Sequence, residues 1–410
     1  MSDPLFSIVM PTRNRPHLLR FSLQSALEQQ FDDFEVVVSD NSTNEETLEL
    51  AKDFDSSRLR YVRTSGGLSM CDSWEFALPH AKGRYITYLC DDDALVPSAL
   101  SQVAEVVHSQ PHIELITWLC GAYTYPDWYD VSDRNELHLG PWSGRVESVD
   151  SSARLEGMYR LLLGGHPTPG MLNSMSSQRL TDRIRGDAGR VFPSIAPDFV
   201  FALSSLAATQ AFLYIDRTLY LTGNSKASIG FSSLLGNLDP LREFLAEIGE
   251  TDLLPDVPLK LPNGMTYCTQ CLFDMQRLNA RIADRRLNVD LVEYFLKTHG
   301  ELRIWEIGGF DVSSEFREFF DGLAHQSRQI QRKVRAHLRL QGVRRHLRLA
   351  VNARPRLQRL ESRLRGSRSS MRRFPGEEYG FSNILECARV VESLAEGMKS
   401  AAAQRHRPRP

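Results

Sequence analysis

The chain has few cysteines, and this scarcity excludes a scaffold held together by disulfides. Its 410 residues include six cysteines, which form no repeated framework of the kind found in small secreted domains. Cys268 and Cys271 have the spacing of a redox or zinc pair, but no second pair and no histidine doublet accompany them. Buried thiols on a helix are therefore the main interpretation, with a metal or disulfide role as the alternative.

The sequence also lacks long apolar runs and a strong charge of one sign. No apolar stretch approaches the roughly 20 residues of a membrane span, and no signal-sequence pattern precedes the first strand pattern. The formal net charge is only -2. These absences predict a soluble, cytoplasmic protein.

What the chain does have is the composition of a folded protein longer than one ordinary domain. Hydrophobic residues make up 42% and aromatic residues 9% of the sequence, enough to bury a substantial core. Residues 1–120 alternate strand and helix patterns, which is typical of a doubly wound α/β sheet. We expect strands at 6–10, 34–38, 59–63, 85–89 and 114–119, and helices over 18–27, from 69 to 82 and after Pro97.

The middle of the chain is less regular. Residues 120–144 are rich in Tyr, Trp, Asp and Gly and show no clear period, and long irregular segments are often functional. Helices are expected at 155–163 and from Pro197, and closing strands at 211–215 and 219–222. Beyond residue 232 the pattern becomes mainly helical.

A triplet of carboxylates, Asp91 to Asp93, directly follows the apolar run 85–89. The carboxyl end of a strand in an open α/β sheet faces the crevice in which such sheets bind ligands. Carboxylate oxygens are hard ligands suited to Mg²⁺ or Mn²⁺, which are often shared with substrate phosphates. The triplet therefore indicates a metal–diphosphate site, with a solvated acidic turn as the alternative.

Three segments together resemble the motifs of the family 2 glycosyltransferases, which have the GT-A fold. They are Phe6 to Arg15, Glu35 to Ser42, and Gly83 to Asp93. The resemblance covers roughly residues 5–225. It implies an α/β, Rossmann-like, mostly parallel catalytic domain over 1–230, with a nucleotide-sugar half at about 1–120 and an acceptor half at about 121–230. A mainly helical extension at 231–410 would follow.

The family resemblance implies inverting transfer of a sugar from a nucleoside-diphosphate donor to a hydroxyl acceptor, assisted by Mn²⁺ or Mg²⁺. Asp92 and Asp93 match the metal carboxylates, and Asp91 matches the residue nearer the donor ribose. Because Asp-x-Asp can also be read as Asp91 and Asp93, the division of roles stays open. Cys90 is given no metal role, since a thiol is a soft ligand.

Other positions match the family's nucleotide site. Asp40 corresponds to the carboxylate that accepts a hydrogen bond from a base N–H, which favours UDP or dTDP; its alternative is an ordinary turn residue. Pro11, Thr12 and Arg13 correspond to the loop around the base and ribose. Lys226 is either a diphosphate ligand or a surface lysine.

Asp198 matches the general base that inversion requires, although an ordinary first-turn acid of a helix is the alternative. Asp182 and Asp187 are the fallback candidates. His166 is interpreted mainly as a structural loop residue, with a place at the border of the acceptor site as the alternative. The acceptor pocket is expected from segments 120–145 and 164–178. The Gln-x-x-Arg-Trp motif of processive relatives is absent, so a single addition is predicted.

Two other functions remain as alternatives. A nucleotidyltransferase is disfavoured because the first loop is not Gly-rich. A non-catalytic, GT-A-like sugar-nucleotide-binding or membrane-surface scaffold protein is the main competitor, because a family histidine after the last strand is missing and Pro197 replaces an acid before Asp198.

The segment 328–373 is strongly basic, and Glu361 is its only acid. Interleaved leucines give it the pattern of a helix that lies on an anionic membrane, here the inner membrane face, or binds an acidic partner. A solvated helical face or a disordered tail is the alternative. Nucleic acid is not an expected partner, since interleaved aromatics and a recognisable module are missing.

Overall fold

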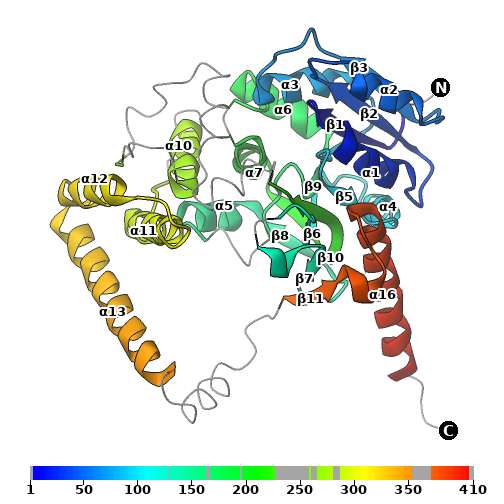
Figure 1. Ribbon diagram of the computed structural model, residues 1–410. Coiled ribbons are helices and arrows are strands. Elements are labelled where there is room, and N and C mark those ends of the chain that lie inside the picture. Colours follow the sequence, from blue (N-terminus) through cyan, green and yellow to red (C-terminus); the bar gives the residue numbers. More distant parts are fainter. Residues whose placement is uncertain are drawn as a thin grey trace. The chain divides into compact units, whose positions relative to one another are not determined.

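The computed structural model describes residues 3–128, 130–162, 167–193, 196–226, 258–259, 266–279, 287–352 and 371–405. The chain divides into two compact units (Figure 1). Unit 1 contains residues 1–155, 164–228 and 372–410, and unit 2 contains 156–163 and 229–371.

Unit 1 begins with the predicted alternation of strands and helices. Its parallel strands β1 (Phe6–Thr12), β2 (Phe34–Asp40), β3 (Leu59–Arg63) and β4 (Tyr85–Tyr88) lie in the order β4-β1-β2-β3. The helices of this half are α1 (Pro16–Leu27), α2 (Glu46–Lys52), α3 (Met70–Ala77) and α4 (Ala99–Ser109). Helix α2 was not predicted, and α4 starts after a Ser98 N-cap, so Pro97 precedes the helix instead of lying in its first turn.

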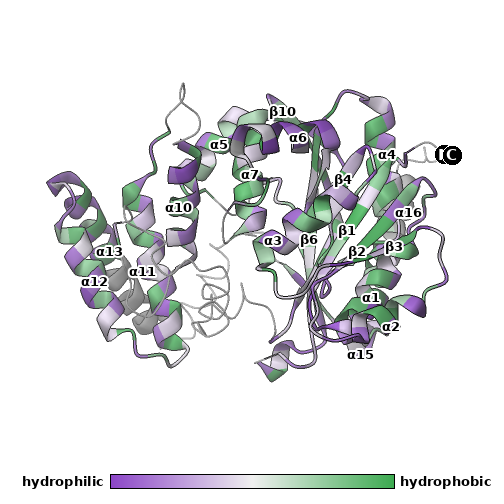
Figure 2. Cartoon of the chain, turned by 90° about the horizontal axis from the view of Figure 1, so that it is seen from above, coloured by the Kyte–Doolittle hydropathy of each residue, from purple (hydrophilic) through white to green (hydrophobic). Residues whose placement is uncertain are grey.

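Successive side chains of the buried strands point to opposite faces of the sheet, and each face packs against different helices. Phe6, Ile8 and Met10 of β1 share a core cluster with Leu19 and Leu23 of α1 and with apolar residues of α4. On the other face, Trp74 of α3 stacks on Tyr88 of β4 with ring centroids 4.9 Å apart. Figure 2 shows green, apolar strands between helices whose outer faces are purple. Burial on both faces explains why these strands are continuous apolar runs.

The second half of unit 1 makes the sheet mixed instead of mostly parallel. It contains β5 (Ala94–Leu95), β6 (Leu115–Thr124), β7 (Glu136–Leu139), β8 (Val146–Asp150), β9 (Ser174–Ser177) and β10 (Ala211–Asn224), with α6 (Gln178–Ala188) and α7 (Pro197–Ala208). Helix α5 (Ser151–Tyr159) begins in unit 1, and its residues from 156 on belong to unit 2. β10 pairs in parallel with β6, whereas β5, β7, β8 and β9 pair antiparallel. The α/β class is confirmed.

The two predicted closing strands are one strand, β10. Its pairing with β6 shifts register between Ile215 and Thr218 and again between Thr218 and Tyr220. The polar residues at this irregularity interrupted the apolar pattern and suggested a break. The strand continues to Asn224, which brings its end beside the aspartate triplet.

The C-terminal residues return to unit 1, which differs from the predicted division at residue 230. β11 (Arg372–Pro375) pairs antiparallel with β7. After α15 (Gly376–Tyr379), helix α16 (Ile384–Arg405) packs against α1, and Glu392 forms an ion pair with Arg217 of β10. Residues 372–395 therefore complete the core of unit 1.

The described part of unit 2 is helical, as predicted. It contains α10 (Tyr267–Asn279), α11 (Leu291–Ile307), α12 (Ser313–Ala324) and α13 (Arg328–Asn352), and α11 packs on the other three. Phe295 and Phe319 join α11 to α12 with ring centroids 5.5 Å apart. Cys268 and Cys271 are buried in α10, as the helix interpretation predicted. None of the described helices combines the length and apolar character needed to cross a membrane.

Candidate functional site

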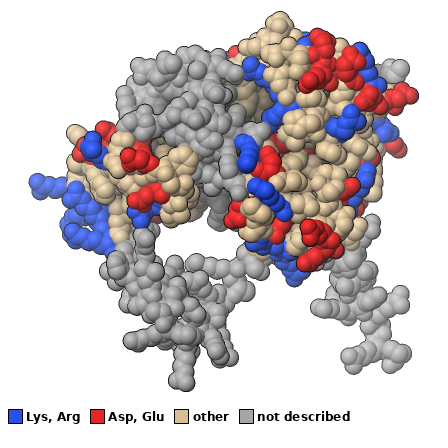
Figure 3. Space-filling model, viewed as in Figure 1, with Lys and Arg blue, Asp and Glu red and all other residues tan. Residues whose placement is uncertain are grey.

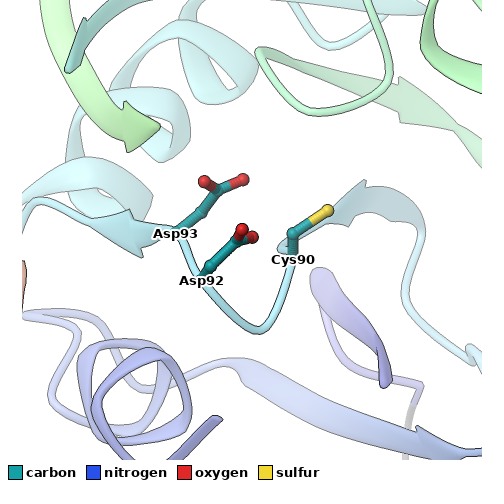
Figure 4. A group of neighbouring side chains, drawn as sticks. All are labelled: Cys90, Asp92 and Asp93. Carbon is teal, nitrogen blue, oxygen red and sulfur yellow. The ribbon is translucent and has the colours of Figure 1, made fainter. Parts of the chain in front are cut away.

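The aspartate triplet lies in the loop between β4 and β5, at the carboxyl ends of β1 and β4. This is the edge at which the sequence predicted a ligand site. Asp91, Asp92 and Asp93 are only 1%, 8% and 5% exposed. The side chains of Cys90, Asp92 and Asp93 point toward the same side of the loop (Figure 4). The three aspartates are therefore buried in the protein, and the loop is not a solvated acidic turn.

Asp91 is held by the loop that follows β1. Thr12 Oγ1 donates a 2.8 Å hydrogen bond to Asp91 Oδ2, and the Arg15 guanidinium lies 3.0 Å from Asp91 Oδ1. The same guanidinium is 3.5 Å from Asp92 Oδ2. The neighbouring Asp91 carboxylate raises the pKa of Arg15 above its usual range, so this side chain is a permanent cation.

Asp93 is turned toward β10. Its Oδ2 accepts a hydrogen bond from the Tyr220 hydroxyl, and its Oδ1 accepts one from the Gly223 backbone N–H at 2.7 Å. Burial raises the pKa of Asp93 well above its usual range. A Cβ atom on Gly223 would overlap the carbonyl oxygen of Asp92, so only glycine allows this approach of strand and loop.

Asp92 differs from its two neighbours in its partners. Among the other described residues, Arg15 is the one with which the Asp92 carboxylate forms an ion pair or hydrogen bond. Burial raises the pKa of Asp92 to about 6, against the opposing effect of Arg15. Asp92 is thus the carboxylate of the triplet with the most capacity left to bind a ligand.

The backbone of the loop is also fixed. Ser22 Oγ of α1 lies 2.8 Å from the carbonyl oxygen of Asp91 and 2.5 Å from that of Asp93. Tyr125 Oη donates a 3.0 Å hydrogen bond to the carbonyl oxygen of Asp92. These contacts hold the carboxylates before any ligand arrives, which reduces the ordering cost of binding.

The residues present fit a hard divalent cation. One potential ligand atom each from Cys90, Asp92 and Asp93 lies within 4.8 Å of the other two. Carboxylate oxygens suit Mg²⁺ or Mn²⁺, whereas burial raises the pKa of the Cys90 thiol well above its usual range and keeps it protonated. Asp92 supplies an available carboxylate, and Asp93 stands beside it with both oxygens already hydrogen-bonded.

The predicted base-binding residue Asp40 is fully buried at the end of β2. Its Oδ1 accepts a 2.8 Å hydrogen bond from the Ser42 N–H, and its Oδ2 accepts one of 2.5 Å from the Tyr61 hydroxyl. Arg63 Nε lies 3.8 Å from Oδ2. A base that binds Asp40 must therefore share or replace the Tyr61 contact.

The other predicted nucleotide-binding residues lie at two strand ends. Pro11 and Thr12 are buried at the end of β1, and Arg13 is half-buried just beyond it. Lys226 is exposed two residues after β10, and its backbone N–H donates to Asp127. Thr12 contacts the aspartate triplet directly.

Asp198 lies in the first turn of α7, behind Pro197. Its side chain is exposed, yet the surrounding protein removes enough water to raise the pKa of its carboxyl. The backbone oxygen of Asp198 is next to Gly170, in a segment expected to shape the acceptor pocket. Within the part of the chain that the structure describes, no hydrogen bond or ion pair joins Asp198 to the aspartate loop.

The fallback candidates for the general base do not lie at the start of a helix beside the expected acceptor segment, as Asp198 does. Asp182 and Asp187 are exposed on α6, and Asp182 pairs with Arg185. His166 lies outside the described residues. Only part of segment 120–145 is left for an acceptor pocket, because residues 120–124 end β6 and residues 136–139 form β7.

Sequence reasoning missed four residues that shape the site, namely Arg15, Ser22, Tyr220 and Gly223. Arg15 stands within the first quoted motif, and its charge beside a predicted acidic crevice was an available signal. Ser22 is a polar residue on the buried side of an apolar helix. Tyr220 and Gly223 carry no local signal, because their role depends on the pairing of β10.

Comparison with known protein families finds a match in the first third of the chain. Residues 7–138 match the model of the family described as Glycosyl transferase family 2. The Escherichia coli protein WfgD, named as a UDP-Glc:alpha-D-GlcNAc-diphosphoundecaprenol beta-1,3-glucosyltransferase, is 30% identical over 24% of this chain and 40% of its own length. A GalNAc(5)-diNAcBac-PP-undecaprenol beta-1,3-glucosyltransferase of Campylobacter jejuni is 30% identical over 25% of this chain and 34% of its own.

A third relative is WcaA of Escherichia coli, a putative colanic acid biosynthesis glycosyl transferase, 34% identical over 24% of this chain and 37% of its own length. The matches thus span two fifths or less of these curated relatives. Among solved structures, Staphylococcus aureus TarS 1–349 in complex with UDP-GlcNAc aligns over 74% of this chain and 81% of its own, with 17% identity and a TM-score of 0.42.

Proposed function

We propose, on the premise that residues 7–138 form a glycosyl transferase family 2 domain, that this chain is a metal-dependent, inverting glycosyltransferase. It transfers a single sugar from a nucleoside-diphosphate donor to a hydroxyl acceptor. The observation that carries the proposal is the buried aspartate loop at the carboxyl ends of β1 and β4, in which Asp92 keeps capacity for a ligand.

The divalent ion is assigned to Asp92, with Asp93 as the neighbouring carboxylate. When bound, Mn²⁺ or Mg²⁺ stabilises the negative charge that develops on the departing diphosphate. The chain's own residues prepare the site for this role. Thr12 and Arg15 orient Asp91, and Ser22 fixes the loop backbone.

The nucleotide is assigned to the ends of β1 and β2. Asp40 accepts a hydrogen bond from the base N–H, which uracil, thymine and guanine offer; UDP or dTDP is the expected donor nucleotide. Pro11, Thr12 and Arg13 contact the base and ribose, Asp91 lies nearer the ribose, and Lys226 contributes a positive charge to the diphosphate.

Asp198 is assigned as the general base that takes the proton of the acceptor hydroxyl. A raised pKa brings a carboxylate closer to the value at which it accepts a proton efficiently near neutral pH. The position of Gly170 beside the Asp198 backbone supports an acceptor path along this segment. Since two relatives are named for diphosphoundecaprenol-linked substrates, we propose a lipid-linked glycan as the acceptor class.

For the segment 328–373 we propose a peripheral contact with an anionic membrane, which would bring the enzyme close to a lipid-linked acceptor. Helix α13 carries eight Arg and Lys residues and no acid. Figure 3 shows blue side chains gathered over the first part of this helix, before the atoms drawn in grey. Arg372 and Arg373 are excluded from this surface, because they belong to β11 and Arg373 pairs with Glu136 and Asp133.

The test is calorimetric titration with UDP, dTDP, GDP and ADP, each with and without Mn²⁺. We expect metal-dependent binding of one diphosphate by the wild type and loss of that dependence in Asp92→Asn. Asp182→Asn removes an exposed carboxylate of the same unit and serves as the control. Absence of binding by all four nucleotides would favour the non-catalytic scaffold instead.

A further inference from the structure

We propose that Arg15 is a built-in counter-cation that makes binding of the divalent ion depend on the diphosphate of the donor. The inference rests on the proposed function, because it assigns Arg15 a role in the same site. Arg15 acts in this proposal through its charge, which balances Asp91 and Asp92, opposes the divalent ion and attracts the diphosphate.

The first support is the geometry of the ion pairs. One guanidinium lies 3.0 Å from Asp91 Oδ1 and 3.5 Å from Asp92 Oδ2. The Arg15 side chain is 33% exposed, whereas those of Asp91 and Asp92 are 1% and 11% exposed. The guanidinium is therefore the most solvent-exposed member of this charged group, and the two carboxylates lie beneath it.

The second support is that the backbone fixes this cation. Arg15 is the N-cap of α1, and Pro16 follows at the first helical position. The preceding Asn14 adopts a positive φ of 56°, and its Oδ1 accepts a 2.9 Å hydrogen bond from the Thr43 N–H. Its own N–H donates to Ser42 Oγ at 2.8 Å. The loop thus presents Arg15 to the aspartates independently of any ligand.

The consequence follows from electrostatics. An ion bound to Asp92 would lie a few ångströms from the guanidinium, and two cations repel strongly at that separation in a partly desolvated site. A diphosphate brings negative charge that the ion and the guanidinium can share. Ion and nucleotide should therefore bind with positive coupling, and the coupling must be reciprocal.

The experiment compares the wild type with the neutral variants Arg15→Gln and Arg15→Met and with Arg15→Lys. Each protein is titrated with Mn²⁺ alone, UDP alone and Mn²⁺ with UDP, by calorimetry and by the manganese EPR signal. The control is Arg20→Gln, which removes a nearby cation of α1 that forms an exposed ion pair with Asp53.

In the wild type we expect weak binding of Mn²⁺ alone and an increase in its affinity of at least ~10-fold in the presence of UDP. The neutral variants should bind Mn²⁺ alone at least ~10-fold more tightly and lose most of the coupling, because the repulsion is gone. Arg15→Lys and Arg20→Gln should keep the wild-type coupling. Two neutral variants are included in case one does not fold.

Unchanged or weaker binding of Mn²⁺ alone in the neutral variants would overturn the proposal, and so would equal coupling in all proteins. Failure of the proposed function has a different signature. In that case neither UDP nor dTDP, titrated in the same way, binds to any of the proteins, while titration with Mn²⁺ alone still reports whether Arg15 opposes the ion.

Discussion

The Tyr220 hydroxyl donates a hydrogen bond to Oδ2 of Asp93 and so joins β10, the last strand of the second half of unit 1, to the aspartate loop. Both residues are buried. The adjacent Asp92 has no such partner within the described residues and contacts Arg15 instead. Consecutive residues of one acidic motif thus have different surroundings, and replacing them should have different effects.

The first prediction compares Asp92→Asn with Asp93→Asn. Asp92→Asn should lower kcat at least ~100-fold, the scale of a lost electrostatic stabiliser, with little loss of stability. Asp93→Asn should lower the free energy of unfolding by about 1–3 kcal/mol. Its amide group has only one acceptor oxygen, so its NH₂ group would face either the Tyr220 hydroxyl or the Gly223 N–H, which are both donors. Urea unfolding and steady-state kinetics measure the two effects. A fully stable Asp93→Asn protein without metal binding would identify Asp93 as a ligand.

The second prediction concerns Gly223. Gly223→Ala would push its Cβ into the carbonyl of Asp92 and displace the aspartate loop. We expect destabilisation of about 1–3 kcal/mol, as for overpacked sites, together with weaker nucleotide binding. Gly140→Ala is the matched control, since nothing lies within 4 Å of its added Cβ. Equal behaviour of the two variants would contradict the close approach.

The third prediction tests the C-terminal return. The Arg217 side chain is 5% exposed and pairs with Glu392 at 3.1 Å. Glu392→Gln leaves that buried cation without its counter-charge and should cost about 3–5 kcal/mol. Arg389→Gln breaks the exposed pair between α16 and Glu28 and should cost at most about 1 kcal/mol. Denaturant unfolding distinguishes the two, and similar losses would argue against a buried pair.

The fourth prediction concerns pH. Desolvation raises the pKa of Asp198 in the folded protein, so its carboxylate is more readily protonated than an ordinary aspartate. If Asp198 is the base, kcat should fall on the acid side as pH drops through this raised pKa. Asp198→Asn should lower kcat at least ~100-fold and remove that acid limb. Since ionisation is disfavoured in the folded state, Asp198→Asn should also become more stable relative to the wild type as pH rises. A retained acid limb would exclude Asp198 as the titrating group.

The sequence predicted well where neighbouring residues alone determine the structure. The strands at 6–10, 34–38 and 85–89 were found because burial on both faces makes them continuous apolar runs. The position of the aspartate triplet followed from its place after such a run. Neither inference needs knowledge of contacts distant in sequence.

Prediction failed where pairing partners are distant. β7 is a four-residue strand with a half-buried His138, and β9 consists of Ser and Met residues. Such strands are defined by their neighbours β6, β4 and β11 and not by their own propensity. Tyr220 was overlooked for the same reason, because its partner Asp93 lies 127 positions away in the sequence.

The pairing of β11 with β7 has a consequence for biosynthesis. Arg373 and Glu136, which meet across these strands, are 237 positions apart. While the ribosome is still making the intervening residues, β7 has no partner on one side, and α1 lacks the helix that covers it. Contacts of such large separation form late and slowly. The nascent chain therefore displays an open sheet edge until residues 372–375 emerge, a period in which a chaperone would protect it from aggregation.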